Sequence, residues 1–324
     1  MTSIDRRLSI APMMTHTDRH FRYFLRLVCR HALLYTEMLT TGALIHGDSR
    51  KLLAYNASEH PLAIQLGGSD PKQLALCASM AQDAGYDEVN LNVGCPSDRV
   101  QSGRFGACLM AEPELVAACV AAMQASVSIP VTVKTRIGID NQDNYQHLYD
   151  FVVKVSDSGC QTFIIHARKA WLQGLSPRQN REVPPLNYQL VHRLKHDFPA
   201  LSILINGGFT TLAQVKEQLQ HVDGVMMGRA ICNNPYLLAQ ADQVVFGDTG
   251  PVPSRHDVMQ QFIHYIEQEM RKGVSFSRMT RHILGMFYGQ GGARAFRRYL
   301  SENIYQANSG VEVIEQAMSL VKAA

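Results

Sequence analysis

Short apolar runs recur along the first three quarters of the chain, and longer amphipathic stretches separate them. Eight of these runs are four or five residues long and rich in β-branched residues. They cover residues 8–11, 33–37, 62–65, 89–93, 131–134, 163–166, 203–206 and 225–228. Because continuous apolar runs that alternate with helical patterns are typical of strands buried on both faces, the pattern predicts a parallel sheet.

The stretches between the runs predict helices. Residues 70–84 follow Ser69 and begin with Asp70 and Pro71, an N-cap with proline just inside the helix, and residues 113–124 carry Ala, Leu and Val at helical spacing. Eight strand–helix units close most economically as a (β/α)₈ TIM barrel, which is the α/β fold we predict. A doubly wound open sheet is the competing fold, but it needs fewer strands and a glycine-rich first turn.

A change of composition at residues 246–254 marks the end of this pattern, because glycine, proline and serine cluster there as in a linker. Beyond it the apolar spacing is helical. The positions are Val258, Phe262, Ile266 and Met270, then Ile283, Met286 and Phe287, then Val313, Ile314, Ala317 and Leu320. The sequence therefore predicts a catalytic barrel domain over residues 1–248 and a small helical bundle over residues 249–324.

Length and cysteine content narrow the class of protein. The 324 residues suffice for a barrel of roughly 250 residues with an appended domain. The seven cysteines are an odd number without a CxxC pair, which favours a cytoplasmic protein and argues against a disulfide framework or a zinc site, so no metal is expected. No run approaches the roughly 18 apolar residues of a membrane span.

The net charge of +3 is unevenly distributed. Up to Asp248 the chain has 22 basic and 22 acidic residues, whereas the remainder has nine basic and six acidic ones. Seven basic residues lie between Glu269 and Glu302, where no acidic residue occurs. They are Arg271, Lys272, Arg278, Arg281, Arg294, Arg297 and Arg298. This asymmetry predicts a surface that meets a polyanion, with a solvated basic face as the alternative.

Polar residues follow six of the apolar runs, at the strand ends where a TIM barrel has its active site. They are Gln65; Asn92 and Cys95; Lys134 and Arg136; His166 and Arg168; Asn206, Gly207 and Gly208; and Gly228 and Arg229. One polar strand end is ordinary, but six around one ring predict a binding site.

Cys95 is the most informative of these residues. The strand pattern of residues 88–93 stops at Gly94, Cys95 and Pro96. Gly94 permits a tight turn and Pro96 removes a ladder donor, so together they place the thiol at the mouth of the sheet. The alternative is a buried cysteine packed under a turn, which is the commoner role of a free thiol.

The glycine-containing turns predict a phosphate site after the seventh and eighth strands. The backbone N–H groups of Gly207, Gly208 and Gly228 can approach a phosphate closely, and Arg229 can add a charged hydrogen bond.

Lys134 and Gln65 then suit a flavin, the lysine by holding electron density on the ring and the glutamine by bonding its pyrimidine edge. A salt bridge from Lys134 to Glu37 is the alternative, because buried lysines are rarely unpaired. His166 is either a ligand to flavin or substrate, or a core imidazole.

The loop over residues 170–181 contains the only tryptophan, Trp171, together with Arg178 and Arg181. Aromatic and basic residues in one loop suit an RNA backbone with an unstacked base. A surface loop anchored by Trp171 explains the composition equally well.

These motifs together resemble those of the tRNA-dihydrouridine synthases, specifically their A-type subfamily, over essentially the whole chain. The general family motifs lie at residues 11–14, 36–38, 65–68, 90–97, 106–110, 134–138, 166–168, 206–208 and 227–229. The A-type marks lie at residues 174–177, 180–182, 280–282 and 292–298. Arg178 departs slightly from the family, where lysine is at least as common at this position.

The resemblance implies an enzyme with FMN and NADPH that reduces the C5=C6 bond of D-loop uridines 20 and 20a in tRNA, with NADH left open as donor. It places FMN on Ala11, Pro12, Met13, Gln65, Lys134, His166, Asn206, Gly207, Gly208, Gly228 and Arg229. It places tRNA on Asn92, Arg178, Arg181, Arg294 and Arg297. The uracil must leave its stack, receive hydride from flavin N5 at C6, and take a proton at C5 from Cys95.

A monomer is expected, because one large substrate covers the site. The competing functions are a small-molecule flavin reductase of the dihydroorotate dehydrogenase kind and a non-catalytic RNA-binding protein. A basic tail argues against the first of these, since a small metabolite has no use for it.

Overall fold

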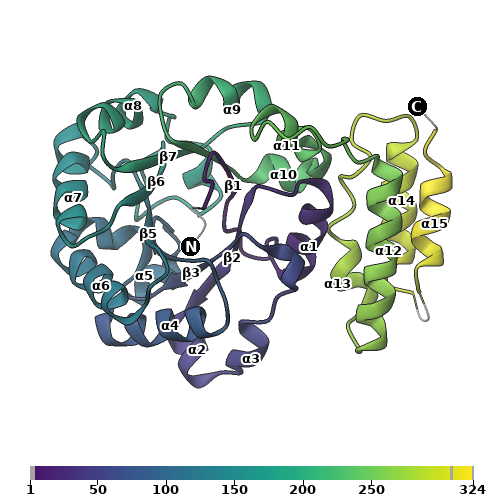
Figure 1. Cartoon of the computed structure of the whole chain (residues 1–324), viewed down its shortest axis with the longest axis horizontal. Helices are drawn as coiled ribbons and strands as arrows, with labels where there is room; N and C mark the ends of the chain where they lie inside the picture. The colour runs from purple at the N-terminus through teal and green to yellow at the C-terminus, as the bar shows by residue number, and fades with distance from the viewer. Residues whose placement is uncertain (1–3, 307–308, 323–324) are drawn as a thin grey trace.

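The computed structural model describes residues 4–306 and 309–322. Residues 1–3 of the expected barrel domain and residues 307–308 and 323–324 of the expected bundle domain lie outside the described residues. Eight parallel strands close into a barrel in chain order, with β8 paired to β1. They are β1 (Leu8–Ile10), β2 (Leu33–Thr40), β3 (Leu62–Gly67), β4 (Glu88–Val93), β5 (Val131–Arg136), β6 (Thr162–His166), β7 (Ser202–Asn206) and β8 (Gly224–Met227). The predicted (β/α)₈ barrel is confirmed (Figure 1).

The longer helices surround the barrel (Figure 1). They are α1 (Arg19–Val28), α4 (Pro71–Asp83), α6 (Pro113–Ser126), α7 (Tyr145–Asp157), α8 (Tyr188–Asp197) and α9 (Leu212–Gln218). The cap predicted for α4 is present, since the Asp70 side chain accepts hydrogen bonds from the N–H groups of Lys72 and Gln73.

Shorter helical segments occupy the connections of the barrel. They are α2 (Thr41–His46), α3 (Ser49–Leu52), η1 (Ala57–Glu59), α5 (Asp98–Ser102), η2 (Gly106–Ala111), η3 (Gln179–Arg181), α10 (Arg229–Asn233), η4 (Pro235–Leu238) and α11 (Ala241–Val244). No described helix is both long and apolar enough to cross a membrane.

The two faces of each strand pack into different surroundings. On β4, Val89, Leu91 and Val93 belong to the large outer core between sheet and helices. The alternating residues Glu88, Asn90 and Asn92 therefore point into the barrel. A separate apolar cluster shares the interior with them and includes Leu33, Tyr35, Ala63, Ile164, Leu204 and Met226. The barrel interior is thus part apolar and part polar.

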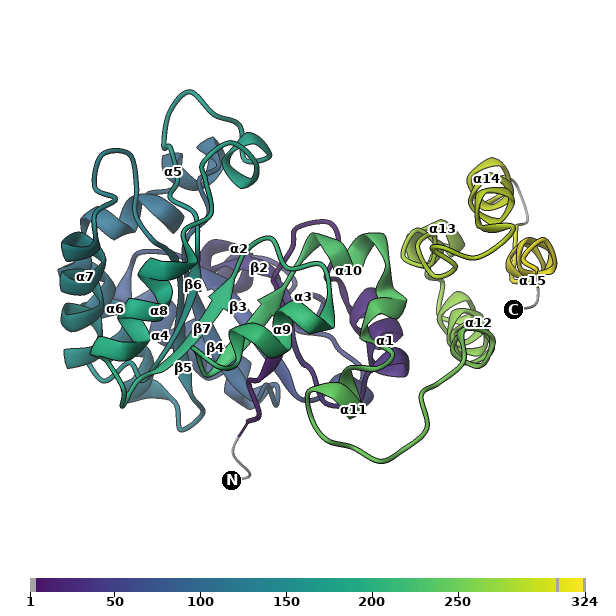
Figure 2. The same ribbon diagram turned by 90° about the horizontal axis from the view of Figure 1, so that it is seen from above.

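The C-terminal region is helical, with α12 (Arg255–Arg271), α13 (Phe276–Thr280), α14 (Ala293–Asn303) and α15 (Glu312–Ser319). Figure 2 shows this bundle on the side of the barrel where α1 lies. Val258, Phe262 and Ile266 of α12 are fully buried, as their spacing predicts.

The helical pattern expected around Ile283, Met286 and Phe287 was wrong in one respect. These three side chains are buried, but residues 281–292 form consecutive turns rather than a helix. Gly289 and Gly292 have φ of 81° and 88°, a left-handed conformation that interrupts a helix.

The bundle docks on α1 through aromatic and charged contacts. Tyr23 stacks on Tyr265 with ring centroids 3.9 Å apart, and one continuous apolar core runs from the barrel helices into the bundle. At the start of α1, Asp18 forms salt bridges with Arg281 at 2.6 Å and His282 at 2.9 Å. These contacts orient the basic bundle relative to the barrel mouth.

Candidate active site

The predicted site residues of the barrel lie at the carboxyl ends of its strands, and the strand register brings several of them together. Asn92 pairs with Lys134 across β4 and β5, and His166 pairs with Asn206 across β6 and β7. The Lys134 ammonium donates a hydrogen bond to Asn206 Oδ1 at 3.1 Å. These four side chains therefore form one polar group at the barrel mouth.

The backbone around Cys95 is held by three neighbours. Asn92 Oδ1 accepts hydrogen bonds from the N–H groups of Gly94 at 3.1 Å and Cys95 at 3.0 Å. The Arg136 guanidinium donates to the Gly94 carbonyl at 2.8 Å, and the Cys95 carbonyl accepts from Ala107 N–H at 2.9 Å. The Cys95 side chain itself is only partly buried, and its Sγ contacts Ser97 Oγ at 3.6 Å, so the thiol is held at the turn and stays accessible.

Cys108, in the family motif over residues 106–110, is a second thiol that could act as the acid, and its environment differs from that of Cys95. Its Sγ lies 3.2 Å from the Phe105 carbonyl oxygen, and burial raises the pKa of the Cys108 thiol. The sequence alone did not separate the two cysteines by environment.

Gln65 and Asn92 are both almost fully buried, with 1% and 8% of their surfaces exposed. Asn92 Nδ2 donates to Gln65 Oε1 at 2.8 Å, and Gln65 Nε2 donates to Asn90 Oδ1 at 2.8 Å. The expected contacts of Gln65 with a flavin and of Asn92 with RNA stay predictions. In the structure the side chains of both residues form hydrogen bonds with neighbouring protein groups.

Lys134 does not pair with Glu37, the alternative that its sequence context left open. The Glu37 carboxylate instead accepts a hydrogen bond from the N–H of Thr15. Burial, followed by the nearby positive charge of Arg136, lowers the pKa of Lys134 to about 7. Within residues 4–306 and 309–322 no carboxylate forms a salt bridge with Lys134 or Arg136, so the barrel mouth carries uncompensated positive charge.

His166 is held as a neutral imidazole. Burial lowers its pKa well below the usual value, and the positive charges of Arg136 and Lys134 act in the same direction. Its ring lies against Gly207, where an added Cβ would come within 2.9 Å of His166 Cδ2. A neutral imidazole can donate or accept a hydrogen bond toward a ligand.

The two glycine turns leave donors free. Gly207 and Gly208 have φ of 129° and 80°, which only glycine adopts without strain. In the described part of the chain, the N–H groups of Gly207, Gly208 and Gly228 donate no hydrogen bond. A Cβ at Gly228 would lie 3.7 Å from Ala11 Cβ and from Met13 Sδ, which places the end of β1 beside this turn.

Arg229 is the charged member of this group, and it is engaged in the structure. It forms a salt bridge with Glu182 at 2.9 Å, in which both side chains are about half exposed. Such an exposed pair contributes at most about 1 kcal/mol, so Arg229 can exchange Glu182 for an anionic ligand.

The loop after β6 is organised by a residue that received no role from its sequence. Asn180 is fully buried and donates from Nδ2 to the carbonyls of Trp171 and Leu175, while its Oδ1 accepts from Trp171 N–H. Arg136 Nη1 donates to the Asn180 carbonyl at 3.1 Å. One guanidinium therefore ties the Cys95 turn to this loop.

The two arginines of this loop have different surroundings. Arg178 is exposed and lies 3.6 Å from Glu182, whereas Arg181 has no ion pair or hydrogen bond from its side chain among the described residues. Lys169 lies 4.1 Å above the Trp171 ring, which favours the anchored form of the tryptophan.

The basic bundle retains unpaired charge. Lys272 pairs with Glu269 and Arg281 with Asp18. The other basic residues of this stretch have no ion pair in the part of the chain that the structure describes. These are Arg271, Arg278, Arg294, Arg297 and Arg298.

A cavity of about 640 Å³ separates the barrel mouth from the bundle. Its barrel side includes His16, Thr210 and Ala230, close in sequence to the glycine turns, and its bundle side includes Tyr288 and Arg297. The described residues that line it include no aspartate or glutamate, which suits a polyanionic ligand.

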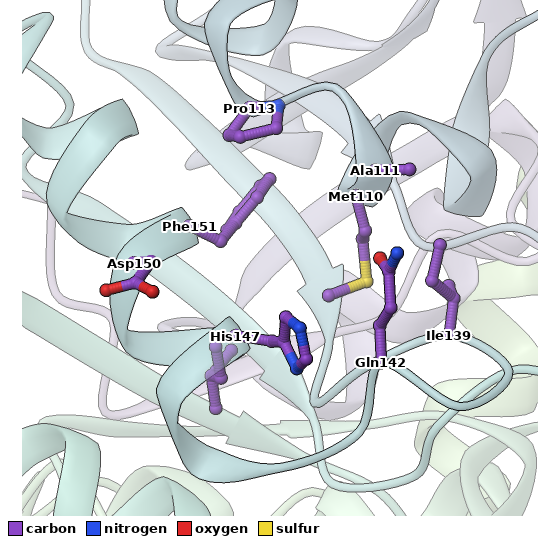
Figure 3. A pocket seen from close by; sticks show the side chains of 9 residues that line it. Met110, Ala111, Pro113, Ile139, Gln142, His147, Asp150 and Phe151 are labelled. Atoms are coloured by element: carbon purple, nitrogen blue, oxygen red, sulfur yellow. The ribbon is translucent and has the colours of Figure 1, made fainter.

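Two other features lie away from this mouth. A cavity of about 230 Å³ between the start of α6 and α7 is lined by Met110, Phe151 and His147 among others and contains no predicted site residue (Figure 3). At the opposite end of the barrel, His31 groups with Asp242 and Asp248. Arg30 already forms salt bridges with both carboxylates, so this group is an ion-pair network.

Comparison with known proteins supports the same conclusion as the motifs. The family described as dihydrouridine synthase matches residues 9–322. Proteins named tRNA-dihydrouridine(20/20a) synthase are 60% identical in Shewanella oneidensis (99% of this chain, 95% of the relative), 59% in Vibrio vulnificus (97% of each) and 56% in Synechocystis (97% and 94%).

A solved structure of a 2-naphthoyl-CoA reductase complex is similar with a TM-score of 0.57 at 11% identity, covering 74% of this chain and 51% of that one. That likeness supports the barrel fold alone. The family match over nearly the whole length, together with the strand-end residues that carry the motifs, shows that this chain belongs to the dihydrouridine synthase family.

Proposed function

We propose that this protein reduces uridines 20 and 20a of tRNA to 5,6-dihydrouridine, with FMN as the flavin, NADPH as the donor and Cys95 as the acid. The observation that carries the proposal is the accessible Cys95 thiol, held by Asn92 at a barrel mouth where Lys134 has no carboxylate partner among the described residues. The relatives' names supply the substrate class.

The residues at the mouth fit FMN. The free N–H groups of Gly207, Gly208 and Gly228 suit the phosphate, and Arg229 can add a charged hydrogen bond. Burial lowers the pKa of Lys134, and a nearby anionic or electron-rich ring would raise that pKa again. The neutral ring of His166 offers a further hydrogen bond, and Gln65, Asn206 and the segment from Ala11 through Pro12 to Met13 complete the expected contacts.

The chemistry that FMN supplies when bound is hydride transfer to C6 of the uracil. Negative charge then develops on C5 and on the C4 carbonyl, so C5 must take a proton. Cys95 provides it: the S–H bond breaks, a C–H bond forms at C5, and a thiolate remains. Lys134 and Arg136 lie close enough to stabilise that thiolate: burial lowers the pKa of both groups, and a negative charge on Cys95 opposes that lowering.

The tRNA surface extends from the loop after β6 to the bundle. Arg181 and the exposed Arg178 lie on the loop, and Arg294 and Arg297 lie on α14. Apart from Arg178, which lies 3.6 Å from Glu182, these guanidinium groups have no ion pair in the described part of the chain, so they can bind phosphates without first breaking an internal salt bridge. Contacts spread over both domains would offset the few kcal/mol needed to extrude the uridine.

We further propose a cytoplasmic monomer that uses NADPH as its hydride donor, with NADH as the open alternative. Comparing the anaerobic bleaching of the flavin by the two donors tests the preference, and light scattering tests the oligomeric state.

The decisive experiment is the variant Cys95→Ala, with Cys108→Ala as the matched control. Cys95→Ala is expected to retain FMN and to lose nearly all dihydrouridine formation in unmodified tRNA, because general acid catalysis is worth about 10²–10⁴-fold. Cys108→Ala is expected to retain activity. Wild-type turnover by Cys95→Ala would refute the assigned role.

A further inference from the structure

A continuous chain of buried hydrogen bonds runs through the barrel interior from its N-terminal end to the Cys95 turn. It starts at Glu88, which is completely buried and forms a salt bridge with Arg6 at 2.6 Å. It continues through Thr132, Asn90 and Gln65, and it ends at Asn92. We name these five side chains, from Glu88 to Asn92, the barrel relay.

Every link of the barrel relay has a defined donor. Thr132 Oγ1 donates to Glu88 Oε1 at 2.8 Å, and Asn90 Nδ2 donates to Thr132 Oγ1 at 2.9 Å. Gln65 Nε2 then donates to Asn90 Oδ1, and Asn92 Nδ2 to Gln65 Oε1, both at 2.8 Å. All four hydrogen bonds point the same way, toward the carboxylate.

This common direction has a chemical cause. A carboxylate in a salt bridge has no proton to give, so Glu88 must accept from Thr132. A hydroxyl has one proton, so Thr132 must then accept from Asn90, which forces the amide nitrogen of Asn90 to face it. Tyr35 also donates to Glu88 at 2.5 Å, which leaves the carboxylate as an acceptor only.

The same constraint passes to each amide in turn. The Asn90 oxygen accepts from Gln65, and the Gln65 oxygen accepts from Asn92. The Asn92 oxygen therefore faces away from the relay, toward the turn at the barrel mouth. That oxygen accepts from the N–H groups of Gly94 and Cys95. A flipped Asn92 would present N–H groups to N–H groups, and the turn would lose both hydrogen bonds.

We infer that Glu88, acting through Thr132, Asn90 and Gln65, is a remote positioning residue that sets the orientation of Asn92 and thereby the position of the Cys95 thiol. The inference rests on the proposed role of Cys95. Glu88, Thr132 and Asn90 have no expected contact with substrate or flavin, so the inference gives a role to buried polar side chains of the barrel interior that the proposed function does not use.

The positioning of Cys95 by the barrel relay matters for one half of the reaction only. Reduction of the flavin needs no proton from Cys95, whereas reduction of the uracil does. A displacement of about 1 Å in a catalytic group can reduce a rate about 10²-fold, so weakening the relay should slow the tRNA half-reaction selectively.

The test is Thr132→Val, which removes the hydroxyl at nearly constant volume, with Thr132→Ser as rescue and Thr135→Val as matched control. Thr135 is fully buried on the same strand, but its hydroxyl donates to the Val93 carbonyl outside the relay. Each FMN-loaded variant is assayed for anaerobic flavin reduction by NADPH, for single-turnover reduction of tRNA, and for tRNA affinity.

Thr132→Val is expected to reduce tRNA about 10–100-fold more slowly, while flavin reduction and tRNA affinity stay within twofold of wild type. Thr132→Ser and Thr135→Val are expected to react like wild type. The rate at which iodoacetamide alkylates the Cys95 thiol is measured by peptide mass spectrometry in the absence of substrate. This rate is expected to change severalfold in Thr132→Val and to stay at the wild-type value in Thr132→Ser and Thr135→Val.

Equal slowing of both half-reactions, or equal effects of Thr132→Val and Thr135→Val, would overturn the inference. If Thr132→Val does not fold, Glu88→Gln replaces it, because an amide at position 88 no longer dictates the direction of the chain; the same selective slowing is expected, and a wild-type tRNA rate would overturn the inference. Full activity in Cys95→Ala would instead refute the proposed function itself.

Discussion

Replacing Lys134 with methionine is expected to stabilise the FMN-free protein near neutral pH while abolishing its retention of FMN. Burial and the neighbouring Arg136 lower the pKa of Lys134 from 10.5 to about 7. At pH 7 the unfolded chain therefore holds a proton that the folded chain has half released. Each pKa unit corresponds to about 1.36 kcal/mol, so the fold pays roughly 4 kcal/mol to bury this amine.

Two effects reduce the gain from the substitution. Lys134 keeps part of its surface accessible, so water screens the charge, and we take about half of the penalty. The variant also loses the hydrogen bond to Asn206, worth about 1 kcal/mol. We therefore expect Lys134→Met to raise the free energy of unfolding by about 1–2 kcal/mol at pH 7.

The sign of the pH dependence makes this prediction specific. Between the folded value of about 7 and the unfolded value of 10.5, the unfolded state binds more protons, so wild-type stability rises with pH. The advantage of Lys134→Met must shrink as pH increases, because the penalty falls by about 1.36 kcal/mol per pH unit toward the unfolded pKa of 10.5. Near pH 9 the halved remainder is about 1 kcal/mol, which the lost hydrogen bond to Asn206 offsets.

Urea unfolding of both FMN-free proteins, followed by circular dichroism at pH 7 and pH 9, measures the effect. Lys154→Met is the control, because Lys154 is a surface residue 3.6 Å from Glu114, and its replacement should change stability by no more than about 0.5 kcal/mol. A variant less stable than wild type at pH 7, or a gain of equal size at pH 9, would contradict the reasoning.

Further predictions concern the bundle and its attachment. Asp18→Ala should lower the free energy of unfolding by about 3 kcal/mol, because it removes the cap of α1 and leaves Arg281 and His282 unpaired. Asp18→Asn keeps an acceptor and should lower it less. Equal urea midpoints for the two variants would count against this reasoning. Burial alone would raise the pKa of Asp18, but the hydrogen bond and charge of His282 outweigh it and hold that pKa well below 3.8. The contribution of Asp18 to the free energy of unfolding is therefore present above pH 3.8 and is lost in acid below it. Melting curves from pH 5 to 2 would measure this loss. The double variant Arg294→Ala with Arg297→Ala should weaken tRNA binding and flatten its dependence on salt by a slope of about 1–2, as filter binding at several salt concentrations would measure; an unchanged slope would exclude phosphate contacts at these residues.

The sequence alone determined the architecture of the barrel and the position of its mouth. Apolar runs of strand length with helical stretches between them leave few folds to choose from, and the carboxyl ends of parallel strands must meet at one end of a barrel. The turn at Gly207 and Gly208 could also be predicted locally, because glycine is the residue that adopts the left-handed conformation which both occupy in the structure. Local patterns suffice for such features because they depend on neighbours in the chain.

Tertiary structure decided which of the polar groups meet. Lys134 could have paired with Glu37, but the closed barrel turns it toward Asn206. Glu88 lies two strand positions before Asn90 and received no role from its sequence, because its contacts with Arg6 and Thr132 require strand register and barrel closure. Side-chain direction across four strands is a property of the closed sheet, and no local pattern encodes it.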